Sequence, residues 1–285
     1  MNPARWTSSA FLAVAVAGLA HADTIVILGA VPQEIVPVQK ALGQHNADSV
    51  NGIHCDIGTL GSHQVVVALT GIGKTNGAMG ATAMVQRFSP RAVFWTGTAA
   101  RVRQTLRAGD VIVATRVMHY DVGRETKDGM LYDFYGYAKG PEDKPGYRPM
   151  VISHDVRSTL SAFDCDPKLV AFAEAFLKGY HADPVSTLGP EYMPQVRAGF
   201  IVAGDLATLT EDNISVIRRN LDPDLLEMEA AAVAQVCTFF HVPFLVICGG
   251  SDLLKEDNPG DYALLSPVAA REAAQFTASL VSALP

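Results

Sequence analysis

Carboxylate side chains follow two of the short apolar runs in the sequence, where acid–base chemistry could take place. Glu34 stands a few residues after the run Thr24–Leu28, and Asp252 follows Ser251, downstream of the run Pro243–Cys248. A carboxylate can take a proton from water, and a carboxylic acid can deliver one to a leaving group. Both residues are therefore candidate catalytic groups. The alternatives stay open, since Glu34 could only begin a helix and Ser-Asp is also a common turn or cap pair.

A third carboxylate stands in the segment Glu227-Met228-Glu229, which opens a predicted helix that runs to Phe240. Acidic residues in a first helical turn often complement the helix dipole, and this explanation holds for either glutamate taken alone. A carboxylate beside a pocket can also accept two hydrogen bonds from neighbouring hydroxyls, such as those of a ribose. Glu229 is our candidate for that second role.

The segment Gly71-Ile72-Gly73-Lys74-Thr75 ends like a phosphate-binding loop, but Ala68 stands where that motif needs its first glycine. Gly77 comes one residue too late for the dinucleotide-binding fingerprint. The segment therefore predicts a tight strand-to-helix turn, although the helix N-terminus could still receive a polar ligand group. A histidine such as His119 is more typical of a structural residue, and we assign it no role.

Strands and helices alternate along the chain. Apolar, β-branched runs predict strands at Thr24–Leu28, Gln64–Leu69, Ala92–Trp95, Val111–Ala114, Gly199–Ala203 and Pro243–Cys248. Helical spacing predicts helices at Gly77–Phe88, Pro167–Lys178, Glu227–Phe240 and Pro267–Leu284. This order predicts α/β layers around a largely parallel sheet. Ligands bind at the carboxyl ends of such strands, and those ends are rich in glycine here.

The first 22 residues differ from the rest of the chain. Arg5 precedes an apolar run from Ala10 to Ala20, and Ala20-His21-Ala22 stands ahead of Asp23. This order is typical of a secretory signal with an A-x-A cleavage site, and the run is too short to span a bilayer. We therefore expect residues 1–22 to be removed and residues 23–285 to form one periplasmic or secreted domain. A buried first helix is the alternative.

Composition and charge narrow the choice of partners. The 285 residues are 49% hydrophobic and carry a formal net charge of −7, which becomes one unit more negative without Arg5. An acidic surface argues against nucleic acid and anionic membranes as partners.

The four cysteines lack Cys-x-x-Cys spacing, so we expect no zinc site, and Cys237 and Cys248 are expected to be buried thiols. The segment Gly123–Met150, rich in Gly, Pro, Tyr and charge, predicts a long surface loop.

Ordered motifs along most of this chain resemble those of the nucleosidase branch of the nucleoside phosphorylase superfamily, closest to nucleosidases that cleave 5'-methylthioadenosine and S-adenosylhomocysteine. The motifs are Ile27-Leu28-Gly29-Ala30 with Glu34, Thr70–Lys74, Thr96-Gly97-Thr98-Ala99, Leu106–Val111, Ile201–Asp205, Glu227–Ala231 and Ser251-Asp252. The resemblance implies a three-layer α/β/α fold with a mixed, largely parallel sheet, and no cofactor or metal. It also implies a homodimer in which the Gly123–Met150 loop or residues around Tyr262 close the partner's sugar pocket.

The resemblance implies cleavage of the bond between a purine and ribose. Asp252 would protonate the leaving base, and Glu229 would hold the ribose hydroxyls while the sugar gains positive charge. Glu34 would orient and deprotonate the attacking water. The other implied substrate-binding residues are Gly73, Thr98, Ala99, Ala207, Thr208, Met228 and Ser251.

Water is favoured over phosphate as the nucleophile. Phosphorolytic relatives hold phosphate with arginines at two places, which here are Val31-Pro32-Gln33 and Phe94-Trp95. Arg101 and Arg103 lie beyond the third motif and keep phosphorolysis as a less favoured alternative.

Two residues depart from the adenine-cleaving members of the family. Ala207 stands where those members carry a phenylalanine that stacks on the base, and Cys248 stands where they carry an arginine. Together with the predicted export, these departures keep open a second hypothesis, a non-catalytic purine-binding or storage protein. The joint presence of Glu34, Glu229 and Asp252 favours the enzyme, because a pure binding protein does not need all three.

Overall fold

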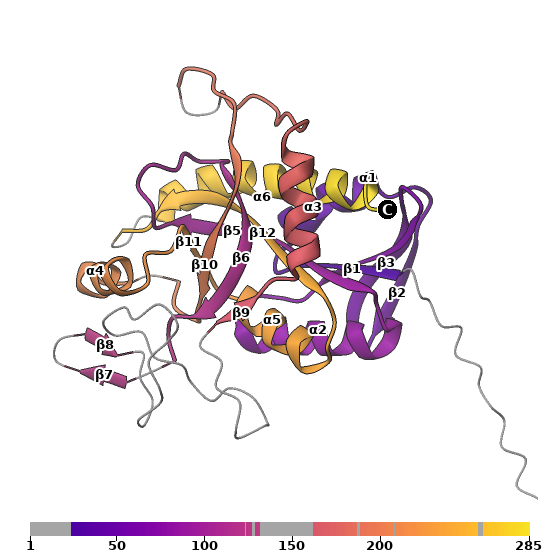
Figure 1. Ribbon diagram of the computed structural model, residues 1–285, viewed down its shortest axis with the longest axis horizontal. Coiled ribbons are helices and arrows are strands. Elements are labelled where there is room, and N and C mark those ends of the chain that lie inside the picture. Colours follow the sequence, from indigo (N-terminus) through magenta and orange to yellow (C-terminus); the bar gives the residue numbers. More distant parts are fainter. Residues whose placement is uncertain are drawn as a thin grey trace, which may run out of the picture.

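The computed structural model describes residues 24–122, 124–126, 129–131, 162–186, 189–207, 209–255 and 259–285. Helices cover both faces of a central β-sheet (Figure 1). The predicted signal segment 1–22 lies outside the described residues, as does most of the predicted loop Gly123–Met150. Within that loop the structure describes a short antiparallel pair, β7 (Arg124–Thr126) and β8 (Gly129–Leu131).

The central sheet is mixed, with the strand order β11-β10-β6-β12-β5-β1-β4-β3-β2. Its strands are β1 (Thr24–Gly29), β2 (Asn46–Val50), β3 (Ile53–Leu60), β4 (His63–Leu69), β5 (Ala92–Arg101), β6 (Val111–His119), β10 (Val196–Ala203), β11 (Leu225–Glu227) and β12 (Phe244–Leu253), with β9 (Phe163–Asp164) paired to β6. The pairs β4–β1, β1–β5, β5–β12, β6–β10 and β10–β11 are parallel. All of β1 is buried, as expected of a strand covered on both faces.

Part of the sheet closes on itself. β11 pairs with β10 and also runs antiparallel to β5, so that β11, β10, β6, β12 and β5 form a ring of strands. Closure brings together strand ends that are far apart in the sequence. The ends of β5, β11 and β12 therefore face one another around the pocket described below.

Two helical layers complete the fold. α1 (Pro32–Ala41) and α6 (Pro259–Ser282) contact each other on one face of the sheet, and α2 (Lys74–Phe88) and α5 (Ala230–Phe239) contact each other on the opposite face (Figure 1). α3 (Pro167–Leu177) joins the first layer through a contact between the rings of Phe176 and Phe276, and α4 (Glu211–Asn220) packs against a small separate cluster that includes Met118 and Leu226. The predicted three-layer α/β/α architecture with a mixed sheet is confirmed.

Three predicted helix starts are wrong, and the first is that of α2, which begins at Lys74 rather than at Gly77. Glu227 does not open a helix: it ends β11, and α5 begins three residues later at Ala230. Leu225 and Leu226 are held as a strand by pairing with β10 and β5, and two apolar residues are too few to indicate a strand in the sequence. α6 begins at Pro259 rather than at Pro267, which lies inside the helix.

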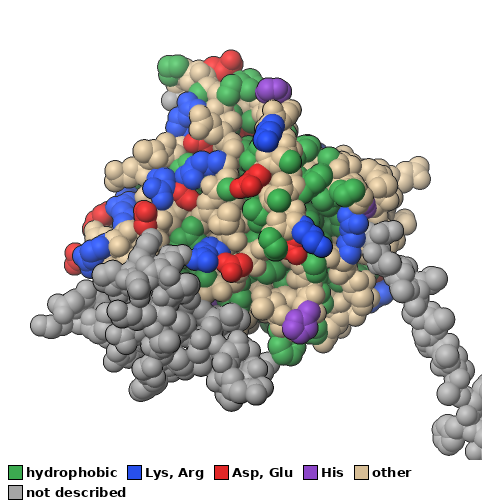
Figure 2. Space-filling model, viewed as in Figure 1, with side chains coloured by type: hydrophobic (Ala, Val, Ile, Leu, Met, Phe, Trp, Pro, Cys, Tyr) green, Lys and Arg blue, Asp and Glu red, His purple; other side chains and the backbone are tan. Residues whose placement is uncertain are grey.

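No helix in the described parts of the chain is long and apolar enough to cross a membrane. Figure 2 shows basic and acidic side chains interspersed on the visible face of the molecule. All four cysteines are buried and unpaired, which agrees with the prediction for Cys237 and Cys248. Within the described ranges there is no group of three or more residues that could hold a metal ion.

Candidate active site

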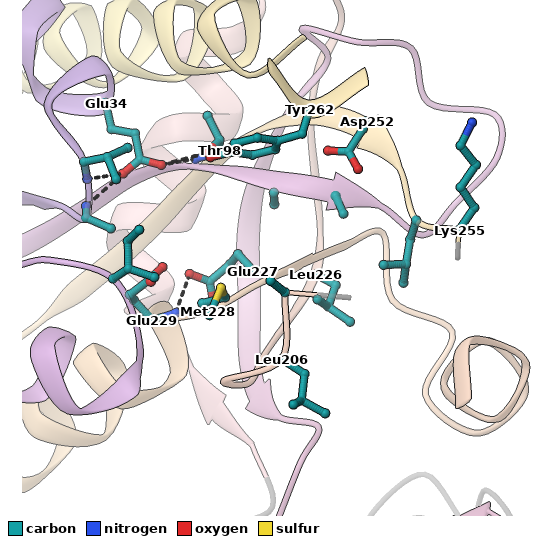
Figure 3. Close-up of a pocket in the computed structure, with 17 residues that line it drawn as sticks. Glu34, Thr98, Leu206, Leu226, Glu227, Met228, Glu229, Asp252, Lys255 and Tyr262 are labelled. Carbon is teal, nitrogen blue, oxygen red and sulfur yellow. Dashed lines mark hydrogen bonds between the residues drawn. The ribbon is translucent and has the colours of Figure 1, made fainter. Parts of the chain in front are cut away.

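A cavity of about 380 Å³ opens where the carboxyl ends of the central strands meet (Figure 3). The lining residues come from the ends of β1, β4, β5, β10, β11 and β12 and from the first turns of α1 and α6. They are Ala30, Val31, Glu34, Ile72, Thr98, Ala99, Ala100, Leu206, Ala207, Leu226, Glu227, Met228, Glu229, Asp252, Leu254, Lys255 and Tyr262. The carboxyl ends of parallel strands are where α/β proteins bind their ligands.

Glu34 lies in the first turn of α1 and is only 3% exposed. Its Oε2 accepts hydrogen bonds from the backbone N–H groups of Ala30 (2.8 Å) and Val31 (3.1 Å). Its Oε1 accepts from the backbone N–H and from the hydroxyl of Thr98, each at 2.8 Å. Glu34 therefore both begins a helix and lines the cavity, and the two sequence interpretations hold together.

Burial raises the pKa of Glu34 above its ordinary value, and the hydrogen bonds from Thr98, Val31 and Ala30 oppose that rise. The Thr98 hydroxyl can rotate, which frees one lone pair of Oε1 for a water molecule in the cavity. A carboxylate that is held rigidly and has a raised pKa is suited to accept a proton from such a water.

Glu227 and Glu229 do different things, although they are two residues apart. The Glu227 carboxylate accepts from the backbone N–H groups of Glu229 and Ala230, at 2.9 Å each, and so serves the N-terminus of α5. Glu229 Oε1 accepts the backbone N–H of Gly73 at 2.6 Å, and Glu229 lines the cavity while only 5% exposed (Figure 3). Glu227 thus complements the N-terminus of α5, and Glu229 is free to bind a ligand hydroxyl.

Burial is the largest cause that raises the pKa of Glu229 to about 7, and the negative charge of Glu34 adds to it. The Gly73 N–H acts in the opposite direction. Burial and then the charge of Glu229 raise the pKa of Glu227 as well. The site therefore holds three close carboxyl groups that resist being charged together.

Asp252 lies near the end of β12, half-buried, and Figure 3 shows it on the other side of Tyr262 from Glu34. The hydroxyl of Ser251 lies 2.9 Å from Asp252 Oδ1 and 3.1 Å from the carbonyl oxygen of Ala99, so it can donate to either. Ser251 is fully buried and does not line the cavity. Its place is behind Asp252, where it can hold that carboxyl group.

Neither arginine that could have served phosphate lines the cavity. The guanidinium of Arg101 donates to the carbonyl oxygens of Ser251 and Leu106, each at 2.8 Å. Arg103 Nε donates to Asp224 at 2.5 Å. Both side chains are thus committed to the protein, which favours water over phosphate as the nucleophile.

The structure places the sequence-predicted residues as follows. Glu34, Thr98, Ala99, Ala207, Met228, Glu229 and Asp252 line one cavity. Gly73 reaches it through its N–H on Glu229, Ser251 lies behind Asp252, and Thr208 lies outside the described residues.

Part of the cavity wall carries no sequence motif. Leu206, Leu226, Leu254 and Lys255 had no motif to mark them, although each stands within three residues of a predicted site residue. Tyr262 lines the cavity of its own chain from the first turn of α6, where burial and the charge of Glu34 are among the causes that raise the pKa of its phenol. The resemblance had pointed to residues around Tyr262 for the pocket of a partner subunit, and here Tyr262 lines the cavity of its own chain.

Comparison with known proteins agrees with this geometry. The chain matches the family model of the phosphorylase superfamily over residues 24–284. It is 33% identical over 236 residues to the 5'-methylthioadenosine/S-adenosylhomocysteine nucleosidase of Bacillus cytotoxicus, which covers 82% of this chain and 88% of the relative. Family membership follows directly: the chain belongs to the phosphorylase superfamily.

Solved structures place it further within that class. The 5'-methylthioadenosine/S-adenosylhomocysteine nucleosidase of Neisseria meningitidis, in complex with methylthio-immucillin-A, superposes with a TM-score of 0.75 at 26% identity and covers 92% of this chain and 100% of that one. The S-adenosylhomocysteine nucleosidase of Streptococcus pyogenes, in complex with 5-methylthiotubericidin, gives a TM-score of 0.74 at 26% identity and covers 94% and 100%. The proteins that this chain is similar to are therefore nucleosidases.

Proposed function

We propose that the protein is a purine nucleosidase that hydrolyses the N-glycosidic bond of nucleosides such as 5'-methylthioadenosine and S-adenosylhomocysteine. The observation that carries this proposal is the single cavity that brings Glu34, Glu229 and Asp252 together. The named relatives and the inhibitor-bound structures support the same reaction. The commitment of Arg101 and Arg103 to protein acceptors supports hydrolysis over phosphorolysis.

The three carboxyl groups have separate tasks in this reaction. Protonated Asp252 donates its proton to a ring nitrogen of the base, which leaves with the electron pair of the bond to C1'. Water attacks C1' and gives its proton to Glu34. Glu229 keeps Oε1 on the Gly73 N–H and accepts ribose hydroxyls with the rest of its carboxylate, which also stabilises the positive charge on the sugar. Solvent returns the proton from Glu34 to Asp252 and closes the cycle.

The base lies against the apolar part of the cavity in this proposal. Leu206, Ala207, Leu226 and Leu254 form a wall of aliphatic side chains there. Ala207 supplies no ring to stack on the base, so the wall acts by excluding water and by shape.

Release of free base tests the proposal. The purified protein is incubated in phosphate-free buffer with adenosine, inosine, methylthioadenosine and S-adenosylhomocysteine, and base release is followed by chromatography. We expect release from at least one of them, unchanged when phosphate is added. Dependence on phosphate would make the protein a phosphorylase. Tight purine binding without release would make it the binding protein of the second hypothesis.

We further propose that the protein works as a homodimer. The side chains of Ile72, Met79 and Phe239 are 56%, 59% and 55% exposed, and they lie on or beside the adjoining helices α2 and α5. Exposed apolar side chains on adjoining helices favour burial against a second copy. Sedimentation equilibrium should give twice the mass of the chain, and a fully active monomer would contradict the proposal.

The proposed place of action is the periplasm or the extracellular space. The order of charge, apolar run and A-x-A site in residues 1–22 supports this. Mass spectrometry of the protein purified from its natural host should give a mature chain that begins at Asp23. Retention of residues 1–22 in the host would refute export.

A further inference from the structure

The turn between β4 and α2 binds two different carboxylates with two consecutive backbone N–H groups. The N–H of Gly73 donates to Glu229 Oε1 at 2.6 Å, and the N–H of Lys74 donates to Asp205 Oδ1 at 2.7 Å. Gly73 has a φ of +95°, a conformation that side-chain-bearing residues rarely adopt, and this directs the two N–H groups to separate acceptors. One turn thus touches the proposed ribose-binding carboxylate and the end of β10.

The side chain of Lys74 completes a closed network around Asp205. Its ammonium group lies 2.7 Å from both carboxylate oxygens of Asp121 and 3.9 Å from Asp205 Oδ2. Asp121 Oδ2 also accepts the backbone N–H of Asp205 at 2.9 Å. The ion pair with Asp121 is largely shielded, because these two side chains are 21% and 14% exposed. Lys74 therefore balances the charge of two carboxylates that lie side by side.

The segment held in this way forms part of the aliphatic wall of the cavity. Leu206 and Ala207 directly follow Asp205 and line the pocket. A second hydrogen bond, from the Tyr120 hydroxyl to the carbonyl oxygen of Leu206 at 3.1 Å, anchors the same segment. Gly204 packs so tightly that an added Cβ would lie 2.5 Å from the Tyr120 ring. The position of this wall segment therefore depends on Asp121, on Lys74 and on the turn between β4 and α2.

We propose that Lys74 is a positioning residue that sets the base-side wall of the cavity at a fixed distance from Glu229. This proposal rests on the proposed function for the names of the two subsites. Lys74 does not line the cavity and touches no reacting atom. It acts through Asp121 and Asp205 on residues 205–207, while the neighbouring N–H of Gly73 holds Glu229.

The effect of removing the ammonium group follows from the charges. In Lys74→Met the backbone N–H still donates to Asp205, but the shielded carboxylate of Asp121 loses its cation and faces the charge of Asp205. Removing one partner of such a pair leaves an uncompensated charge, and we expect the segment to move in response to the repulsion between Asp121 and Asp205. Base binding then weakens, whereas the contact between Gly73 and Glu229 remains. The loss should fall on KM rather than on kcat.

The experiment compares three Lys74 variants in the full-length mature protein. For Lys74→Met we expect the Kd of adenine and the KM of methylthioadenosine to rise about tenfold, with kcat within about threefold of the wild type. Lys74→Arg keeps the cation and should stay within about threefold in all values. Adding Asp121→Asn to Lys74→Met removes the stranded charge but keeps an acceptor for the Asp205 N–H, and this should recover most of the affinity. Lys40→Met, at an exposed lysine near the end of α1, is the matched control.

The outcomes separate this inference from the proposed function. Calorimetric binding of adenine needs no turnover, so the comparison of variants stands even where the wild type releases no base. Unchanged adenine Kd and KM in Lys74→Met would overturn the inference, and so would a double variant no better than Lys74→Met. If Lys74→Met does not fold, the double variant and Asp121→Asn alone replace it. A double variant that folds and binds adenine like the wild type supports the inference, and one with a tenfold weaker Kd overturns it.

Discussion

Glu34→Gln tests the most highly connected side chain of the site. The wild-type carboxylate accepts four hydrogen bonds, two on each oxygen. A glutamine must turn its NH2 group toward one pair of donors. Facing Thr98 costs less than facing Ala30 and Val31, because the Thr98 hydroxyl can rotate and become an acceptor. One donor, the Thr98 backbone N–H, is then left without a partner.

The cost can be estimated from that single donor. A buried N–H without a partner costs about 1–3 kcal/mol, and in a domain of this size that corresponds to a fall in melting temperature of roughly 2–12 °C. Burial raises the pKa of Glu34, so the ionised wild-type side chain already carries a desolvation cost that glutamine avoids. This places the expected fall toward the lower end of the range. Loss of the base should also lower kcat by about 100- to 10,000-fold.

Thermal unfolding and base release from methylthioadenosine, both at neutral pH, measure the two effects. Glu174→Gln, at an exposed glutamate of α3, is the control and should change neither value. A Glu34→Gln protein with an unchanged melting temperature would show that the four hydrogen bonds do not hold the side chain as described. Activity within tenfold of the wild type would remove Glu34 as the base.

Three further substitutions separate the other roles. Asp252→Asn keeps the shape but cannot deliver a proton, so kcat should fall by about two to four orders of magnitude with binding retained; a retained kcat would assign the acid elsewhere. Burial raises the pKa of Glu229 from 4.5 to about 7, so the protonated form stabilises the fold fully below pH 4.5 and this contribution is lost as the pH rises through 7. Glu229→Gln should flatten that part of the unfolding free energy against pH, and equal slopes in both proteins would contradict the shift. Ala207→Phe should tighten adenine nucleosides by about 1–3 kcal/mol if the ring reaches the base; unchanged affinity in a folded variant would place the base elsewhere.

The central strands were predictable because each consists of a continuous run of apolar, β-branched residues. β1 and β4 are short, β-branched and buried along nearly their whole length, which gives continuous apolar runs. β2 could not be found in the same way, because its residues Asn46–Val50 are exposed except for Val50. It exists through antiparallel pairing with β3 across the turn Asn51-Gly52, where both residues have positive φ, so the Asn-Gly pair rather than an apolar pattern was its signal.

The helix that carries Glu34 shows a related limit. α1 holds Pro37 inside, so local propensity argues against a helix over Pro32–Ala41, although Pro32 suits the first position of a helix. Packing against α6 supports it, and Glu34 itself accepts N–H groups at its N-terminus. The Glu34 side chain thus helps to stabilise the helix that carries it. From the sequence, Glu34 could be identified as a candidate residue, but the extent of its helix could not.

The candidate site was predictable where chemistry depends on residue type and hidden where it depends on closure of the sheet. The carboxylates could be identified as candidates from their residue type, and the resemblance assigned a role to each of them. The aliphatic wall of Leu206, Leu226 and Leu254 forms only because β11 joins β10 to β5, so that three distant strand ends share one cavity. A leucine after a strand has no feature that predicts this.

Cys248, which stands where the resemblance leads one to expect an arginine, affects the electrostatics of the site. It is fully buried, and after burial the charges of Glu227, Glu34 and Glu229 are the causes that raise the pKa of its thiol. A neutral thiol cannot compensate those carboxylates, whereas the arginine that the resemblance leads one to expect at this position would favour their ionised forms. The rise in the pKa of Glu229 to about 7 is consistent with such a neutral neighbour. Since only ionised Glu229 accepts hydroxyls with both oxygens, kcat/KM should climb with pH until about 7, and an activity independent of pH between 5 and 8 would show that Glu229 keeps its charge without an arginine.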